Sequence, residues 1–124
     1  MKIVIVEDEE ALSKALRAKF EDSGFDVYVA ENGGGALGVV KEAQPDIIAL
    51  DILMPEKNGF EILKELKEDP DLKNIPVVVL SNLGQDEDIK RAIRMGAEDY
   101  LVKTQHPISE VVEKFKTILA KKFA

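Results

Sequence analysis

The sequence predicts an α/β fold in which a parallel five-stranded sheet is covered by helices on both faces. Two observations carry this prediction. Short apolar runs rich in β-branched residues recur five times, and each is followed by a segment with the apolar spacing of an amphipathic helix. The runs are continuous rather than alternating, which is typical of strands buried on both faces of a doubly wound sheet. The predicted architecture is therefore a doubly wound (βα)5 sandwich.

The predicted strands and the first two helices follow in chain order. The strands are 3–6, 27–30, 47–50, 77–80 and 100–102. Leu12, Leu16 and Phe20 recur at every fourth residue and predict a first helix that ends at Gly24. Apolar residues between 36 and 43 predict a second helix, closed by Pro45.

Four glycines crowd the start of the second helix, at positions 33, 34, 35 and 38. A glycine inside a helix costs about 1 kcal/mol relative to alanine, so we expect a mobile loop and a frayed first turn here. A phosphate-cradling loop is the alternative, but the run lacks the Lys-Ser/Thr ending of a P-loop.

The last three helices complete the repeat. Phe60, Leu63 and Leu66 predict a third helix that ends before Pro70, with Asn58 as its N-cap. A fourth helix around Ile89 is stopped by Gly96. The fifth carries apolar residues from 108 through Phe123, with Pro107 placed in its first turn.

Composition narrows the class of protein. The chain has 124 residues, 24 acidic and 17 basic, with a net charge of −7 and no cysteine. This length favours one domain, predicted to span 1–124. The acid excess argues against nucleic-acid binding by this chain, and the lack of cysteine excludes disulfides, zinc thiolate sites and cysteine catalysis. Because no apolar run is long enough for a signal peptide or a membrane span, we expect a cytoplasmic protein without membrane association.

Polar side chains stand at the carboxyl ends of four predicted strands, where ligands bind in open parallel sheets. They are Glu7 and Asp8 after the first strand, Asp51 after the third, Ser81 after the fourth and Lys103 after the fifth. Carboxylates brought within about 4–6 Å of one another raise each other's pKa unless a cation intervenes. Oxygen ligands without histidine or cysteine favour Mg²⁺ as that cation, and a carboxylate beside such a metal can act as a nucleophile that forms an aspartyl phosphate. The following Glu9 and Glu10 are interpreted only as acids at a helix N-terminus.

These residues carry a family resemblance. Glu7-Asp8, the run DILMPEKNG at 51–59, Ser81 and the run GAEDYLVK at 96–103 resemble the receiver domain of bacterial two-component response regulators (CheY-like) over the whole chain. The resemblance implies that the (βα)5 sandwich is flavodoxin-like, with the strand order 2-1-3-4-5.

The resemblance also implies a role for each site residue. Asp51 would accept a phosphoryl group from the phosphohistidine of a sensor histidine kinase or phosphotransfer protein. Asp8, Asp51 and the backbone carbonyl of Leu53 would ligate Mg²⁺ directly, and Glu7 would act through water. Lys103 would pair with the phosphoryl oxygens. Ser81 would hydrogen-bond the phosphoryl group and move toward it, while Tyr100 would rotate between exposed and buried positions.

The implied function is a phosphorylation-activated signalling switch that catalyses only its own phosphorylation and dephosphorylation. The changed surface would lie on the fourth helix, the fifth strand and the fifth helix. The implied state is a monomer or a phosphorylation-dependent dimer. The cognate kinase and the downstream protein partner stay open.

Two residues depart from the family pattern, and two others stand at positions that affect the rate of dephosphorylation. Thr104 follows Lys103 where the family usually has proline, and without proline we expect a trans peptide bond there or a strained cis exception. Asn82 replaces a small alanine after Ser81 and either obstructs the site or adds a donor. Leu53 and Leu83 stand where the family tunes hydrolysis of the aspartyl phosphate, and neither can hydrogen-bond an attacking water. We therefore expect slow self-dephosphorylation.

Three other functions are compatible with parts of this pattern. A degenerate receiver kept as a protein-interaction module would explain Asn82, Thr104 and the glycine-rich helix. A phosphatase of the aspartyl-phosphate type needs a second aspartate two residues after the nucleophile, where this chain has Leu53. A flavodoxin-like cofactor-binding protein needs a Ser/Thr-rich phosphate loop after the first strand, which is absent from this sequence.

Overall fold

The computed structural model describes residues 1–123, and Ala124, the last residue of the predicted domain, lies outside the described residues. Its five strands are β1 (Lys2–Val6), β2 (Asp26–Ala30), β3 (Ile47–Leu50), β4 (Val77–Ser81) and β5 (Asp99–Val102). They form one parallel sheet in the order β2-β1-β3-β4-β5. The predicted fold class and strand order are confirmed.

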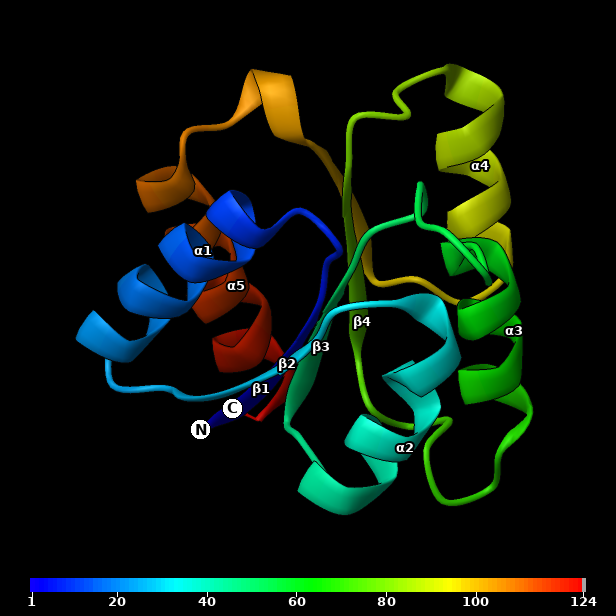
Figure 1. Ribbon diagram of the computed structural model, residues 1–124, viewed down its shortest axis with the longest axis horizontal. Coiled ribbons are helices and arrows are strands. Elements are labelled where there is room, and N and C mark those ends of the chain that lie inside the picture. The colour runs from blue at the N-terminus through cyan, green and yellow to red at the C-terminus, as the bar shows by residue number, and fades with distance from the viewer. Residues whose placement is uncertain (124) are drawn as a thin grey trace.

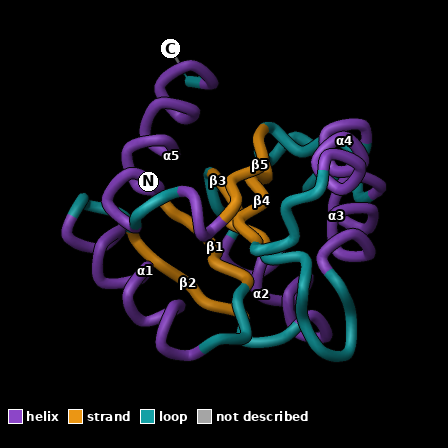
Figure 2. The backbone as a smooth tube through the Cα atoms, turned by 90° about the horizontal axis from the view of Figure 1, so that it is seen from above, coloured by secondary structure: helices purple, strands orange, loops and turns teal. Residues whose placement is uncertain are grey.

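Helices cover both faces of the sheet (Figures 1 and 2). They are α1 (Glu10–Asp22), α2 (Gly33–Ala43), α3 (Gly59–Glu68), α4 (Asp86–Arg94) and α5 (Ile108–Lys122), with a short 3-10 turn, η1 (Lys103–Gln105), before α5. The helices α1 and α5 lie side by side on one face, and α2, α3 and α4 cover the other. In the part of the chain that is described, no helix combines the length and the apolarity that crossing a membrane requires.

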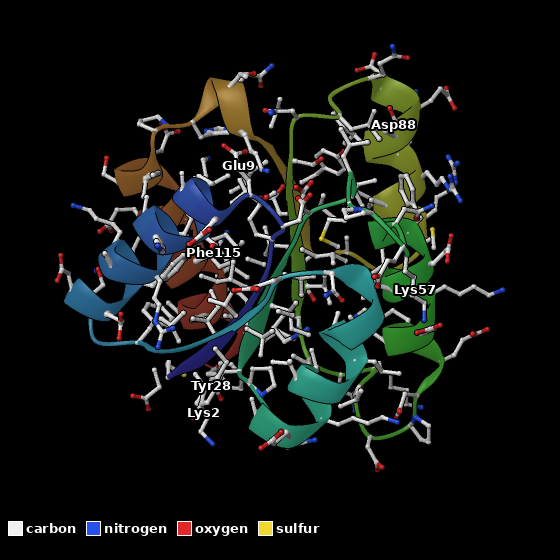
Figure 3. The ribbon with its side chains drawn as sticks, in the orientation of Figure 1. Lys2, Glu9, Tyr28, Lys57, Asp88 and Phe115 are labelled. Carbon is white, nitrogen blue, oxygen red and sulfur yellow. The ribbon has the colours of Figure 1, made fainter. Side chains whose placement is uncertain are left out.

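The two faces of the sheet enclose separate apolar cores. On the face of α1 and α5, Phe20 packs edge-to-face against Phe25 and Phe115, with ring centroids 5.1 and 5.3 Å apart. Figure 3 shows Phe115 in the layer of side chains between these helices and the sheet. On the other face, α2 and α3 contribute Val40 and Leu63 to the second core. Burial on both faces explains why the strands read as continuous apolar runs.

The glycine-rich segment was wrongly predicted as a loop with a frayed turn. The helix α2 begins at Gly33, directly after Asn32, and includes the whole run. The side chain of Asn32 accepts a hydrogen bond from the Gly35 N–H at 2.9 Å, so the first turn is capped. The cap offsets part of the low helix propensity of the glycines.

The last helix, α5, also differs from its predicted bounds at both ends. Pro107 is the residue that precedes α5, not a member of its first turn, and Phe123 lies just beyond the end of the helix with 55% of its surface exposed. The apolar spacing that reached Phe123 therefore overestimated the helix by one residue.

Removing the cap of α2 is expected to cost stability. We expect Asn32→Ala to lower the free energy of unfolding by about 1 kcal/mol, because the Gly35 N–H loses its acceptor in a helix of low intrinsic propensity. Urea unfolding of both proteins measures the change. Gln85→Ala is the matched control, since Gln85 precedes α4 without a capping hydrogen bond from its side chain and should change stability little. Equal losses in the two variants would contradict this account of α2.

Register brings the carboxyl ends of the strands to one edge. Val6 at the end of β1 pairs with Leu50 at the end of β3, and Ser81 at the end of β4 pairs with Val102 at the end of β5. Residues that directly follow these pairs must therefore lie close together, although they are far apart in the chain.

Candidate functional site

Two buried carboxylates stand at the ends of β1 and β3. Glu7 and Asp51 are 2% and 4% exposed. Their main chains are fixed by the sheet, because Asp51 N–H donates to the carbonyl of Val6 at 3.0 Å and Glu7 N–H donates to that of Ala30 at 3.0 Å. The sheet itself thus holds two acidic groups side by side in a poorly solvated position.

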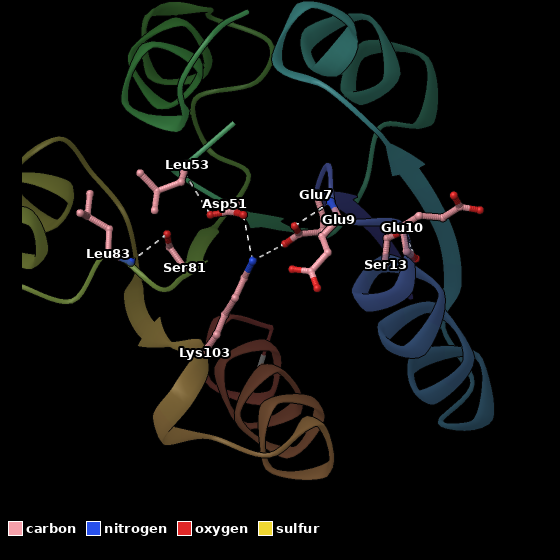
Figure 4. Close-up of polar contacts among 9 residues, drawn as sticks. All are labelled: Glu7, Glu9, Glu10, Ser13, Asp51, Leu53, Ser81, Leu83 and Lys103. Atoms are coloured by element: carbon pink, nitrogen blue, oxygen red, sulfur yellow. Dashed lines mark hydrogen bonds and ion pairs between the residues drawn. The ribbon is translucent and has the colours of Figure 1, made fainter. Parts of the chain in front are cut away.

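Lys103 lies between these carboxylates (Figure 4). Its Nζ is 2.7 Å from Oε2 of Glu7 and 2.9 Å from Oδ2 of Asp51. The lysine directly follows β5, so it arrives at the site from a third strand end. One ammonium therefore bridges two carboxylates that would otherwise repel each other.

The burial of these groups changes their proton affinities. Burial raises the pKa of the Glu7 carboxyl to about 7, repulsion from Asp51 adds to the rise, and the hydrogen bond from Lys103 opposes it. Burial alone would lower the pKa of Lys103, but its hydrogen bonds to Glu7 and Asp51 outweigh burial and raise that pKa. The ammonium thus stays charged, whereas Glu7 changes its charge near neutral pH.

A third carboxylate completes an acidic cluster. Oxygen atoms of Glu7, Asp8 and Asp51 all lie within 4.8 Å of one another. They line an open, polar pocket of about 360 Å³, whose other lining residues are Glu9, Leu53, Asn82 and Lys103. An all-oxygen donor set that includes buried carboxylates fits a hard divalent cation such as Mg²⁺ or Mn²⁺.

The loop after β3 orients Asp51. Leu53 N–H donates to Oδ1 of Asp51 at 3.1 Å, while Lys103 engages Oδ2. The Leu53 side chain is 54% exposed at the rim of the pocket. The loop ends at Asn58, whose Oδ1 accepts from Glu61 N–H at 3.1 Å, so the predicted N-cap of α3 is confirmed.

Leu83 connects Ser81 to Tyr100. Its N–H donates to Oγ of the fully buried Ser81 at 3.3 Å, and its carbonyl accepts a hydrogen bond from the hydroxyl of Tyr100. Tyr100 is 8% exposed and therefore lies in the inward of the two expected positions. Burial, with the nearby carboxylates of Asp88 and Asp51, raises the pKa of Tyr100 to about 12, so the phenol stays protonated as a donor.

Comparison with known protein families identifies the family to which a chain with this site belongs. The model of the response regulator receiver domain matches residues 3–116, which include every site residue described above. The chain belongs to the response regulator receiver domain family. It is thus a module of two-component signal transduction, as the sequence motifs indicated.

Individual relatives agree with this assignment. Protein PilH of Pseudomonas aeruginosa is 36% identical over 109 residues, which are 88% of each protein. The chain spans about half the length of the other first curated relatives, among them a PhoB phosphate regulon transcriptional regulatory protein of Rhizobium meliloti that is 37% identical over 82% of this chain and 45% of its own length.

Solved structures share the fold. The BeF3-activated N-terminal receiver domain of Klebsiella pneumoniae RstA has a TM-score of 0.88 and 30% identity over 96% of this chain and 98% of its own. The response regulator Rcp1, solved in an Mn²⁺-bound form, has a TM-score of 0.82 and 28% identity over 94% of this chain and 91% of its own.

The pocket has two further lining residues, of which the sequence indicated Asn82 but not Glu9. Glu9 lines the pocket and its N–H donates to Oε1 of Glu7 at 3.1 Å, so it does more than precede a helix. Asn82 also lines the pocket, which keeps open both effects expected of it. For Glu9 the available signal was its place two residues after Glu7. The Lys103–Thr104 peptide bond is trans, as expected without proline.

Proposed function

We propose that this receiver domain accepts a phosphoryl group on Asp51 and works as a phosphorylation-activated signalling switch. The observation that carries the proposal is the bridge from Lys103 to Asp51 and Glu7 at an acidic, open pocket. Two donors orient Asp51, the Leu53 N–H on Oδ1 and the Lys103 ammonium on Oδ2. Glu7 is also held by two donors, so the choice of Asp51 as the acceptor follows from its match to the phosphoacceptor position of the receiver family. A nucleophile held in this way needs little reorganisation before it reacts.

The proposed transfer is a single displacement. An Asp51 oxygen attacks the phosphorus of a phosphohistidine, a P–O bond forms, the P–N bond breaks and the imidazole nitrogen keeps the electron pair. The donor is a sensor histidine kinase or a phosphotransfer protein. Lys103, already 2.9 Å from Asp51, is placed to neutralise charge on the transferred oxygens.

We propose Mg²⁺ as the cofactor of this reaction. Glu7, Asp8, Asp51 and the main-chain carbonyl of Leu53 are the residues that would hold it, and when bound it supplies positive charge to the phosphoryl oxygens. The three carboxylates already lie within 4.8 Å of one another. Without a metal ion, Lys103 and the main-chain N–H donors of Glu9 and Leu53 offset part of their repulsion.

Ser81 and Tyr100 are proposed to transmit the effect of phosphorylation from the pocket to the surface of the domain. If Oγ of Ser81 turns to the phosphoryl group, it no longer accepts from Leu83 N–H, and Leu83 can move. Because Leu83 also accepts from the Tyr100 hydroxyl, its movement releases the aromatic side chain on β5. The consequence is a changed surface on α4, β5 and α5, where a downstream protein would bind.

Intact mass after incubation with acetyl phosphate and Mg²⁺ tests the proposal. We expect a species heavier by about 80 Da, one phosphoryl group, that disappears with a chelator and in the Asp51→Asn variant. Glu61→Gln, which removes an acid outside the pocket, should leave the added mass unchanged. No added mass in the wild-type chain would instead favour the degenerate receiver that acts as an interaction module.

The phosphorylated state is expected to be long-lived. Leu53 lies at the rim of the pocket and Leu83 beside Ser81, and neither side chain can orient water for attack on phosphorus. We expect Leu53→Asn combined with Leu83→Glu to lose phosphate roughly tenfold faster, because polar side chains position the water. The decay of the added mass measures this rate, with the exposed Phe123→Asn as control. An unchanged decay rate in the double variant would contradict the role given to Leu53 and Leu83 in slow dephosphorylation.

A further inference from the structure

The start of α2 packs directly against the loop between β3 and α3. A Cβ atom at the buried Gly33 would lie 2.0 Å from the carbonyl oxygen of Lys57 and 2.8 Å from its Cβ. A Cβ atom at Gly34 would lie 2.6 Å from Oε2 of Glu56. Figure 3 shows Lys57 on this loop, beside the N-terminal end of α2. At position 33 the contact is with the backbone, so only glycine permits it.

The loop is not free to absorb a displacement. Glu56 has a φ of 69°, a left-handed conformation that non-glycine residues rarely adopt. Lys57 N–H donates to the carbonyl of Pro55 at 2.8 Å, Gly59 N–H donates to that of Ile52 at 2.9 Å, and Lys57 pairs with Glu65 of α3. The turn is therefore closed on itself and tied to α3.

The same loop reaches the acidic pocket. Leu53 lines the pocket, and its N–H holds Oδ1 of Asp51 at 3.1 Å. Real Cβ atoms essentially never approach another atom within 3.0 Å, so a side chain at position 33 must separate α2 from Lys57 by about 1 Å. A misplacement of about 1 Å at a reacting group can cost a hundredfold in rate.

We propose that Gly33 is a positioning residue for the phosphoacceptor site. It acts through the β3–α3 loop: by letting α2 touch the backbone of Lys57, it sets where Leu53 lies relative to Asp51. This role rests on the proposed function of Asp51 and Leu53. It gives Gly33 a role that compensates for its low helix propensity.

Substitutions within α2 itself make a matched series. Gly33→Ala meets backbone, Gly34→Ala meets the far end of a flexible side chain, and Gly38→Ala meets nothing within 4 Å. Three quantities are measured in each variant: the Kd for Mg²⁺, the rate of phosphorylation by acetyl phosphate, and the backbone amide resonances of Leu53 and Lys57. Gly33→Ala is also made in a Gly38→Ala background, whose higher helix propensity keeps the domain folded.

We expect Gly33→Ala to shift the resonances of Leu53 and Lys57, to raise the Kd for Mg²⁺ tenfold or more and to slow phosphorylation by a similar factor. Gly34→Ala should change the Kd for Mg²⁺ and the phosphorylation rate by less than threefold, because the Glu56 carboxylate can swing away. Gly38→Ala should change these two quantities by less than twofold. A folded Gly33→Ala variant with a wild-type Kd and rate would overturn the inference.

The two proposals fail in different ways. If the wild-type chain neither binds Mg²⁺ nor takes a phosphoryl group, the proposed function of the site falls. The positioning role is then judged from the amide resonances alone: a shift of Leu53 in Gly33→Ala, absent in Gly38→Ala, supports it, and an unshifted Leu53 overturns it.

Discussion

Replacing Lys103 with methionine is expected to lower the free energy of unfolding by about 3–5 kcal/mol at pH 8 and to abolish phosphorylation of Asp51. The Lys103 Nζ is the shared partner of Glu7 and Asp51, which are 2% and 4% exposed. Removing it leaves two buried carboxylates that repel each other without compensation. The transferred phosphoryl group also loses its neighbouring ammonium.

The loss of stability should depend on pH. The folded-state pKa of Glu7, about 7, lies above its usual value of 4.5, so folding favours the neutral carboxyl. Ionised Glu7 therefore costs stability, and this cost is absent below about pH 4.5 and fully present above about pH 7. Because Lys103 opposes the cost, its removal should destabilise the domain more at pH 8 than at pH 5.

Urea unfolding at both pH values measures this effect. Lys122→Met is the matched control, since Lys122 also forms an ion pair, with Glu98 at 2.8 Å, but at an exposed site. An exposed pair contributes about 0–1 kcal/mol, so the control should change stability little at either pH. A Lys103→Met variant equally destabilised at pH 5 and pH 8 would contradict the role given to Glu7.

Magnesium affinity is expected to fall steeply in acid. Between pH 8 and pH 5 the apparent Kd should rise by up to about a hundredfold, because a proton on Glu7 competes with the cation below about pH 7. The sign follows from the raised pKa: Glu7 is ionised and available above about pH 7 and protonated below it. A Mg²⁺ titration followed by amide resonances at several pH values measures the Kd.

Glu7→Gln separates proton competition from other effects of acid. The amide cannot ionise, so the variant should bind Mg²⁺ more weakly at pH 8 and lose most of its pH dependence. Glu42→Gln, which removes an acid from α2 far from the pocket, should keep the wild-type profile. A Kd that does not change with pH in the wild-type chain would argue against Glu7 as part of the metal site.

The fold and most of the site could be predicted because they depend on local patterns. Each strand is a short apolar run, and parallel pairing brings the residue after each strand to one edge, which placed Glu7, Asp51 and Lys103 correctly. Those positions need no knowledge of packing. The site's general place follows from periodicity and register alone.

Other features depend on contacts between distant segments and escaped prediction. The run that starts at Gly33 reads as a weak helix because propensity scales do not contain the backbone of Lys57, 24 residues away. Likewise the apolar spacing of α4 does not indicate that Arg91 lies over the ring of Phe60, with its guanidinium carbon 3.9 Å from the ring centroid. In both cases tertiary packing overrides what the local sequence favours.

The contacts of Lys103 with Glu7 and Asp51 also make the site depend on the order in which its residues are synthesised. Glu7, Asp51 and Lys103 follow strands β1, β3 and β5, and Lys103 is 52 residues beyond Asp51. During synthesis Asp51, the proposed phosphoacceptor, therefore emerges well before its ammonium partner. A nascent or truncated chain that lacks β5 would carry Asp51 without the charge that supports its reaction. If Asp51 accepts a phosphoryl group as we propose, the chain becomes competent to respond to a phosphodonor once β5 has joined the sheet and placed Lys103 beside Asp51.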